Sequence, residues 1–135
     1  MNSLDSIQFL DFKEHSRGVT KLLAIEGDQL GCASLERVFF LTSTNTDNRG
    51  GHAHKNCTQW FTILSGSSVL KVSDGQTTRS LDLLYPSQVI QIPPGIWVDV
   101  LLLEPTIIAV FADLKYDEED YIRVWEDFLT FRGTE

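Results

Sequence analysis

The chain is poor in cysteine and has no long apolar run, and each of these absences narrows what the protein can be. Its 135 residues include two cysteines, Cys32 and Cys57, and one domain of this size buries an adequate core without disulfide or metal support. No stretch approaches the ~20 apolar residues of a membrane-spanning helix, and the first residues lack the pattern of a secretory leader. We therefore predict a single domain over residues 1–135, in the cytoplasm, with no membrane partner and with both thiols reduced.

Excess positive charge is also absent, since the formal net charge is -8. This balance argues against nucleic acid as a partner. The charge is uneven: residues 1–71 hold equal numbers of acidic and basic side chains, whereas residues 113–127 hold seven acidic and two basic ones. We expect the acidic run to form a solvated face. An anionic small ligand remains feasible in the first half, which carries Arg17, Arg37, Arg49 and Lys55.

Helical segments do not alternate with the extended ones, which excludes a parallel α/β sheet. Turn sequences such as Asp74-Gly75 and Pro93-Pro94-Gly95 separate short extended runs, a pattern typical of a closed or sandwiched antiparallel architecture. A further turn is predicted at residues 45–48. The predicted strands cover residues 7–12, 20–26, 37–42, 52–54, 59–64, 68–72, 79–84, 89–92, 97–103 and 106–111.

One helix is predicted near the C-terminus, over residues 117–129. Asp117 is a suitable N-cap, and acidic residues follow it in the first turn, where the helix dipole favours them. Tyr121, Trp125, Phe128 and Leu129 fall on one stripe. We expect this aromatic stripe to pack on the sheets rather than to contact a ligand.

The most informative residues are His52 and His54, because two positions apart on a strand they project from the same face. With Gln59 and Gly66 they reproduce the frame His-x-His-(four residues)-Glu-(six residues)-Gly, which resembles that of the β-barrels called cupins, except that Gln59 replaces the carboxylate. Val98 stands where a second cupin segment usually supplies another histidine. Two imidazoles alone are a poor metal site, so we expect no metal and two histidines that move protons. The alternative is a structural pair satisfied by hydrogen bonds.

Longer motifs make the resemblance more specific. Arg49-Gly50-Gly51-His52-Ala53-His54-Lys55 and Tyr116-Asp117-Glu118-Glu119-Asp120-Tyr121-Ile122-Arg123 together resemble the WxcM-like cupins, sugar 3,4-ketoisomerases that act on dTDP-4-keto-6-deoxyglucose in bacterial surface-polysaccharide pathways. The resemblance covers nearly the whole chain. It implies an all-β fold, a cupin jelly-roll antiparallel β-barrel with one C-terminal α-helix. It also implies an isomerase that needs no cofactor or metal, and a homodimer, in which the apolar strand at residues 7–10 would add to a neighbour's sheet.

The implied reaction moves a carbonyl from C4 to C3 of the sugar through an enediol. In that reaction we expect His52 to be the base that takes the proton from C3, and His54 to relay a proton or to hold the developing oxyanion. Cys57, close in sequence to the pair, is a candidate nucleophile or a small core residue. The residues expected to bind the dTDP-linked keto sugar are Arg17, Arg37, Arg49, Gly51, Lys55 and Gln59.

One departure from the family pattern concerns Phe40. Family members usually read Arg-Val-x-Tyr where this chain reads Arg37-Val38-Phe39-Phe40, and a tyrosine can exchange a proton with the sugar whereas phenylalanine cannot. His54, Tyr85 or a bound water are the candidates to replace it.

Two other functions stay open: a 3,5-epimerase of a nucleotide-linked keto sugar, and a non-catalytic module that binds a nucleotide sugar.

Overall fold

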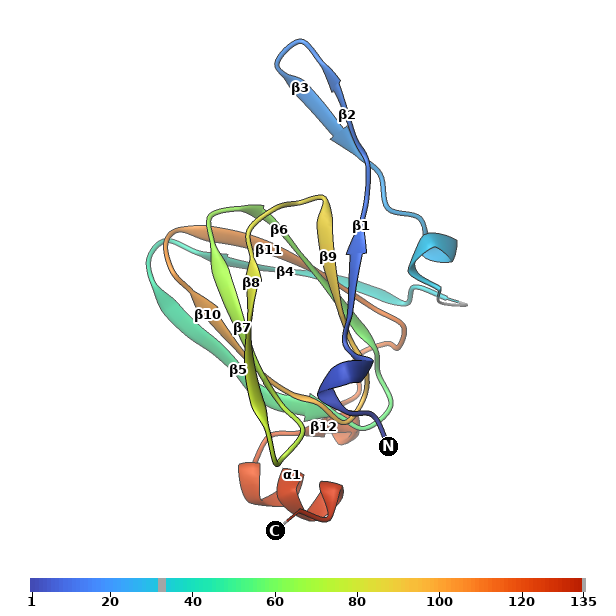
Figure 1. The fold of residues 1–135 in the computed structure, drawn as a ribbon, viewed down its shortest axis with the longest axis vertical. Coiled ribbons are helices and arrows are strands. Elements are labelled where there is room, and N and C mark those ends of the chain that lie inside the picture. The colour runs from blue at the N-terminus through green and yellow to red at the C-terminus, as the bar shows by residue number, and fades with distance from the viewer. Residues whose placement is uncertain (32–33, 135) are drawn as a thin grey trace.

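The computed structural model describes residues 1–31 and 34–134, and in these ranges the chain is built mainly from antiparallel strands (Figure 1). Short 3₁₀ turns lie at Leu4–Ser6, Gly27–Leu30 and Glu118–Asp120, and one α-helix, α1, spans Trp125–Arg132. A first sheet has the strand order β1 (Gln8–Asp11), β9 (Gln88–Ile92), β6 (Gln59–Ser65), β11 (Thr106–Ala112) and β4 (Arg37–Ser43). A second sheet has the order β12 (Tyr121–Ile122), β5 (Asp47–His54), β10 (Trp97–Leu102), β7 (Ser68–Ser73) and β8 (Thr78–Leu83).

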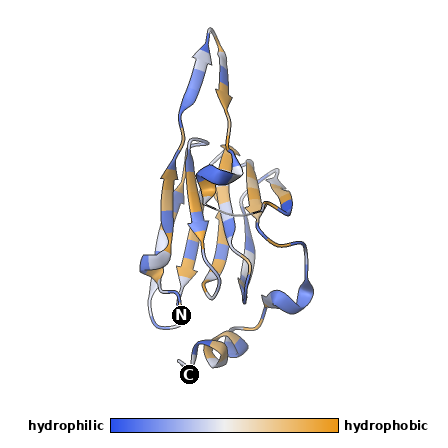
Figure 2. Ribbon diagram, turned by 90° about the vertical axis from the view of Figure 1, so that its right-hand side faces the viewer, coloured by the Kyte–Doolittle hydropathy of each residue, from blue (hydrophilic) through white to orange (hydrophobic). Residues whose placement is uncertain are grey.

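The two sheets face each other and bury the core between them. Along the strands apolar and polar residues alternate, as Figure 2 shows by hydropathy, so that one face of each sheet is available for packing. The inward side chains form a continuous apolar cluster that includes Phe61, Ile63, Leu70, Val72, Ile90 and Val110. Alternation of residues along the sequence thus leads directly to the two-layer architecture.

The predicted all-β class is confirmed, but the barrel is not closed. The strand pairings of the described residues stay within each five-stranded sheet or within one separate hairpin. Connections such as those from β5 to β6 and from β10 to β11 pass from one sheet to the other, as in a jelly roll. The result is an open sandwich in which the space between the sheets is accessible at one end.

All ten predicted strands are present, with some changes of length. Strand β5 begins at Asp47, inside the predicted turn at 45–48, and the two-residue strand β12 and the hairpin strand β2 (Glu14–Arg17) were not predicted. Residues 47–51 have low β-propensity, yet they pair with β10 through a register from Leu102↔Asp47 to Asp99↔Gly50. Tertiary pairing therefore overrides local preference at this point.

The predicted helix begins eight residues later than expected. Asp117 does cap a turn, because its side chain accepts a hydrogen bond from the Glu119 backbone N–H, but that turn is the 3₁₀ segment Glu118–Asp120. The chain then pairs with β5, Tyr121 opposite His54, before α1 starts at Trp125. Trp125 and Phe128 pack on Trp97, as expected of the stripe, whereas Tyr121 does not.

The N-terminal strand β1 pairs with β9 of its own chain, from Gln8↔Gln91 to Asp11↔Gln88, and is an edge strand of the first sheet. Beyond it, β2 and β3 (Thr20–Leu23) form a hairpin that projects from the sandwich (Figure 1).

Of the two cysteines, Cys57 is a buried free thiol, and Cys32 lies outside the described residues. None of the helices in those residues is long and apolar enough to cross a membrane.

Candidate active site

A cavity of about 410 Å³ opens between the two sheets and collects four of the residues singled out in the sequence. Arg37 enters it from β4, Gln59 from β6, and Arg49 and His52 from β5. Phe61, Val98 and Val100 form much of its apolar wall. A few polar groups set in an apolar concave surface are the usual features of a small-molecule site.

A bulge in β5 brings Arg49 and His52 to the same wall. On a regular strand, residues three apart face opposite sides. Here Val98 pairs with His52 and Asp99 pairs with Gly50, so the intervening Gly51 has no partner in the β10 ladder. The extra residue changes the alternation, and both side chains face the cavity.

Glycine is required at Gly50 for two reasons. Its φ of 108° is a conformation that side chains disfavour, and a Cβ atom there would lie 2.8 Å from the carbonyl oxygen of Val98. Gly51, the predicted ligand residue, does not line this cavity; a Cβ on it would lie near Asp99 and Trp97 instead. The glycine pair therefore shapes the strand, with Gly50 at the cavity surface.

Two other predicted binding residues lie elsewhere. Arg17 is exposed at the end of β2, in the projecting hairpin, because that segment pairs only with β3. Lys55 follows β5 and lines a separate surface depression together with Arg123, Asp127 and Phe131. Neither residue lines the cavity between the sheets.

His52 is held neutral by its surroundings. Its pKa is lowered from 6.5 to about 4, mainly by burial and then by the neighbouring His54 and Arg123. Its ring lies 5.1 Å from the His54 ring, edge to face. A neutral imidazole at the cavity surface can accept a proton at cellular pH.

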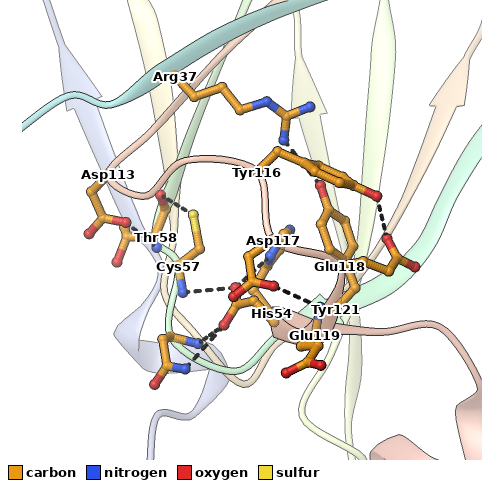
Figure 3. A network of polar contacts seen from close by, with 12 residues as sticks. Arg37, His54, Cys57, Thr58, Asp113, Tyr116, Asp117, Glu118, Glu119 and Tyr121 are labelled. Carbon is orange, nitrogen blue, oxygen red and sulfur yellow. Dashed lines mark hydrogen bonds and ion pairs between the residues drawn. The ribbon is translucent and has the colours of Figure 1, made fainter.

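His54 is buried behind His52, and Asp120 fixes its orientation. Its Nδ1 lies 3.0 Å from Asp120 Oδ2, and the close-up in Figure 3 shows the ring inside a polar network. Asp120 also accepts hydrogen bonds from the backbone N–H groups of Asn56 (2.8 Å) and Cys57 (3.3 Å). Burial lowers the pKa of His54, while the Asp120 hydrogen bond opposes this shift. The Nε2 atom has no hydrogen-bond partner among the described residues.

The contact between His54 and Asp120 was not predicted from the sequence, because the sequence analysis places Asp120 in a solvated acidic face. That interpretation is wrong for Asp120, and two other acidic residues of the run make specific contacts. Asp120 is buried and Asp113 accepts the backbone N–H of Thr58 at 2.9 Å. Glu118 forms a two-point contact with Arg123, with Arg123 Nε and Nη2 lying 2.6 and 2.9 Å from its two oxygens. The signal that was available is the Tyr-Asp-Glu-x-Asp-Tyr motif, whose last tyrosine, Tyr121, pairs with His54 of β5.

Tyr121 is the second residue that the sequence interpretation missed. It lines the cavity, and its ring centroid lies 4.2 Å from that of His54 and 5.1 Å from that of His52. Its hydroxyl accepts a hydrogen bond from Arg37 Nη1 at 3.2 Å (Figure 3). The guanidinium of Arg123 lies over the ring, 4.1 Å from its centroid. The site therefore contains a phenol between two cations and two imidazoles.

Phe40, where the sequence departs from the family pattern, does not face this cavity. Strand alternation directs Phe39 and Leu41 inward, whereas Phe40 lies in an outer groove of the first sheet with Leu64 and Phe111. Tyr85, a suggested replacement, is exposed and does not line the cavity. A hydroxyl at position 40 would therefore not reach a sugar bound between the sheets.

One group of side chains has the composition of a metal site: His54, Cys57 and Asp120 offer ligand atoms within 4.8 Å of one another. Burial raises the pKa of the Cys57 thiol to about 11, which opposes the thiolate that metal binding or nucleophilic attack requires. Both Asp120 oxygens already accept hydrogen bonds. These residues fit the role of orienting His54 better than that of ligands, and Cys57 behaves as a core residue.

The chain is similar to a protein family, to a curated relative and to solved structures. The FdtA family model, described as WxcM-like, C-terminal, matches residues 5–133. A curated relative from Aneurinibacillus thermoaerophilus, TDP-4-oxo-6-deoxy-alpha-D-glucose-3,4-oxoisomerase, is 32% identical over 126 residues, or 90% of this chain and 89% of the relative.

The similar solved structures include complexes of QdtA, a sugar 3,4-ketoisomerase from Thermoanaerobacterium thermosaccharolyticum. One, in complex with TDP, is 25% identical with a TM-score of 0.88 and covers 96% of each chain. The other, a mutant in complex with TDP-4-keto-6-deoxyglucose, is 25% identical with a TM-score of 0.89, and the match covers 98% of this chain and 97% of that one.

Proposed function

The chain belongs to the WxcM-like FdtA family, and on this premise we propose that it is a sugar 3,4-ketoisomerase that converts dTDP-4-keto-6-deoxyglucose into the dTDP-3-keto-6-deoxyhexose. The observation that carries the proposal is the pair of imidazoles at the cavity, one at its surface and one fixed by a buried carboxylate. The known relatives act on, or are bound to, the same class of nucleotide-linked sugar.

In the proposed mechanism the imidazole pair moves the carbon-bound proton. His52, neutral and at the cavity surface, takes the proton from C3, which is acidified by the neighbouring C4 carbonyl. The resulting enediol receives a proton at C4. His54 lies behind His52 and is held by Asp120, so it stabilises the imidazolium of its neighbour or exchanges the proton with it.

We assign the diphosphate of the nucleotide to the cationic part of the cavity. Arg49 is exposed at the cavity and its side chain makes no hydrogen bond or ion pair with any described residue, so its planar donor fork is available for phosphate oxygens. Arg37 and Gln59 are proposed to contact the sugar. The proposed binding site within one chain does not include Arg17, Gly51 or Lys55, because these residues lie outside the cavity.

The decisive experiment is NMR of the sugar after the protein is incubated with dTDP-4-keto-6-deoxyglucose. We expect the carbonyl carbon to shift from C4 to C3. Inversion at C3 or C5 with the carbonyl still at C4 would identify the epimerase alternative. Thermal stabilisation by the nucleotide sugar without turnover would identify a binding module.

The proposed reaction needs no metal, because the cavity offers no carboxylate ligand at Gln59 and no histidine at Val98. Turnover should be unchanged after exhaustive chelation, and metal analysis of the active protein should give substoichiometric amounts. Restoration of a lost activity by one divalent ion alone would contradict this prediction.

We propose that the protein is a homodimer. The outer face of the first sheet exposes Val38, Phe40, Leu64 and Ile107 by 38% or more, and apolar patches of this kind favour association. The projecting hairpin, which carries Arg17, is the element that can reach a second copy. Light scattering at micromolar concentration should give twice the chain mass, whereas Phe40→Lys should shift the equilibrium toward the monomer. A monomeric wild-type mass would overturn the proposal.

We further propose that the product supplies an aminotransferase that makes a 3-amino-3,6-dideoxy sugar for bacterial surface polysaccharide, since a 3-keto group is the substrate of such a transamination. Deletion of the gene in its host, followed by sugar analysis of the surface polysaccharide, tests this role. The cytoplasmic location expected from the sequence stays a prediction.

A further inference from the structure

Ketoisomerisation moves two protons, and the histidine pair accounts for only one of them. The carbon-bound proton passes from C3 to C4. The second passes from the hydroxyl oxygen O3 to the carbonyl oxygen O4. A group that donates to O4 and accepts from O3 is needed for this transfer, and a hydroxyl can do both.

Of the residues that line the cavity, Tyr116 and Tyr121 carry hydroxyls. Tyr116 donates its proton to Glu118 Oε2 at 2.6 Å, and its ring is largely exposed. The third tyrosine of the chain, Tyr85, lies outside the cavity. Phe39, which does face the cavity, has no hydroxyl.

The hydroxyl of Tyr121 is different, because its own hydrogen is available. The oxygen accepts a hydrogen bond from Arg37 Nη1, and the described residues offer no acceptor for the phenolic hydrogen. That hydrogen can therefore be donated to a ligand. The ring rests against both imidazoles, so the hydroxyl and the proposed base belong to one wall of the site.

Two guanidinium groups lie close to the Tyr121 side chain. Arg37 donates directly to the oxygen, and Arg123 lies 4.1 Å from the ring centroid. The contacts of Arg123 with Glu118, at 2.6 and 2.9 Å, fix its position. A guanidinium that donates to the oxygen, with a second one over the ring, can stabilise the transient negative charge that proton donation would leave.

We propose that Tyr121 is the catalytic residue that carries the oxygen-bound proton, an inference that rests on the proposed function. As the base takes the C3 proton, the C3–H electrons form the C3=C4 bond, the π electrons of C4=O move to O4, and O4 takes the proton of Tyr121. The phenolate then takes the proton from O3, the O3–H electrons form the C3=O bond, and the π electrons of C3=C4 form a bond from C4 to the proton held by imidazolium. Tyrosine and imidazole are both restored, and no oxidant or co-reactant is consumed.

The test compares Tyr121→Phe with Tyr85→Phe, a matched change outside the site, on dTDP-4-keto-6-deoxyglucose. Phenylalanine keeps the ring contacts but removes the hydroxyl, so Tyr121→Phe should lower kcat by about a hundredfold, the usual contribution of a positioned acid or base. KM and the calorimetric affinity for TDP should change by less than about threefold, since the phosphates are bound elsewhere. Tyr85→Phe should match the wild type.

A second variant covers the case in which Tyr121→Phe fails to fold. 3-Fluorotyrosine incorporated at position 121 keeps both ring and hydroxyl and should retain kcat within about tenfold, with its pH profile displaced to lower pH. Normal turnover by folded Tyr121→Phe, or a greater loss in Tyr116→Phe, would overturn the assignment while leaving the proposed function intact. If the wild type itself does not shift the carbonyl, the proposed function fails and this assignment fails with it.

Discussion

At the scale of single residues, the two histidines have different environments although they are two positions apart. His52 faces the cavity and has a pKa of about 4. His54 is buried and fixed by Asp120. The sequence alone predicted the larger catalytic role for His52. We propose a comparable role for His54, because a carboxylate that orients an imidazole selects its tautomer and stabilises its charged form.

We therefore expect His52→Asn and His54→Asn each to lower kcat by about a hundredfold or more, with nucleotide-sugar binding by calorimetry preserved. Asp120→Asn, which presents an amide to His54 Nδ1, should resemble His54→Asn. In deuterated water the wild-type product should carry solvent deuterium at C4. Normal turnover of folded His52→Asn would show that His52 is not the base.

At the scale of elements, the bulge in β5 decides which side chains form the site. It inserts Gly51 between the pairs Val98↔His52 and Asp99↔Gly50, and so brings Arg49 to the face of His52. Strand β12 has a similar influence, because its pairing with β5 brings Tyr121 and Asp120 against the histidines. The wall of the cavity that carries His52, Arg49 and Tyr121 is thus formed by the bulged strand β5 and the short strand β12, at the edge of the second sheet.

Gly50→Ala should disrupt this arrangement. The added Cβ would lie 2.8 Å from Val98 O at a φ of 108°, at a cost of about 1–3 kcal/mol in unfolding free energy. Gly18→Ala is the control, since it has a φ of 61° at the hairpin tip and nothing within 4 Å, and should cost about 1 kcal/mol. Urea unfolding of both variants measures the difference. Equal losses would mean that the close approach to β10 does not matter.

At the scale of the whole molecule, the buried histidines make stability depend on pH. The folded-state pKa of His52 is about 4 against an ordinary value of 6.5, and the pKa of His54 is also lowered. Between these values the unfolded chain binds more protons than the folded one, so stability falls as the pH falls. The stabilising contribution is fully present above pH 6.5 and is lost as the pH approaches 4.

Unfolding free energy from urea titrations should therefore be lower at pH 5 than at pH 8, by on the order of 1 kcal/mol for His52 after allowance for solvent screening. His52→Asn should reduce this difference, since it removes the group. An unchanged pH dependence in that variant would exclude His52 as a cause. The acid limb of kcat/KM should likewise lie below pH 6.5.

The sequence by itself determined the all-β antiparallel class, because strand alternation and turn residues are local signals that each segment carries alone. It also located His52 and His54 by their spacing on one strand, and Arg37, Arg49 and Gln59 through the resemblance to a known family. Only the tertiary structure decided that Asp120 leaves the acidic run to hold His54, that Tyr121 belongs to a strand rather than a helix, and that Phe40 faces outward. Those outcomes depend on pairing between segments some 65 to 70 residues apart, such as His54 with Asp120 at a separation of 66, and local propensity contains no information about such partners.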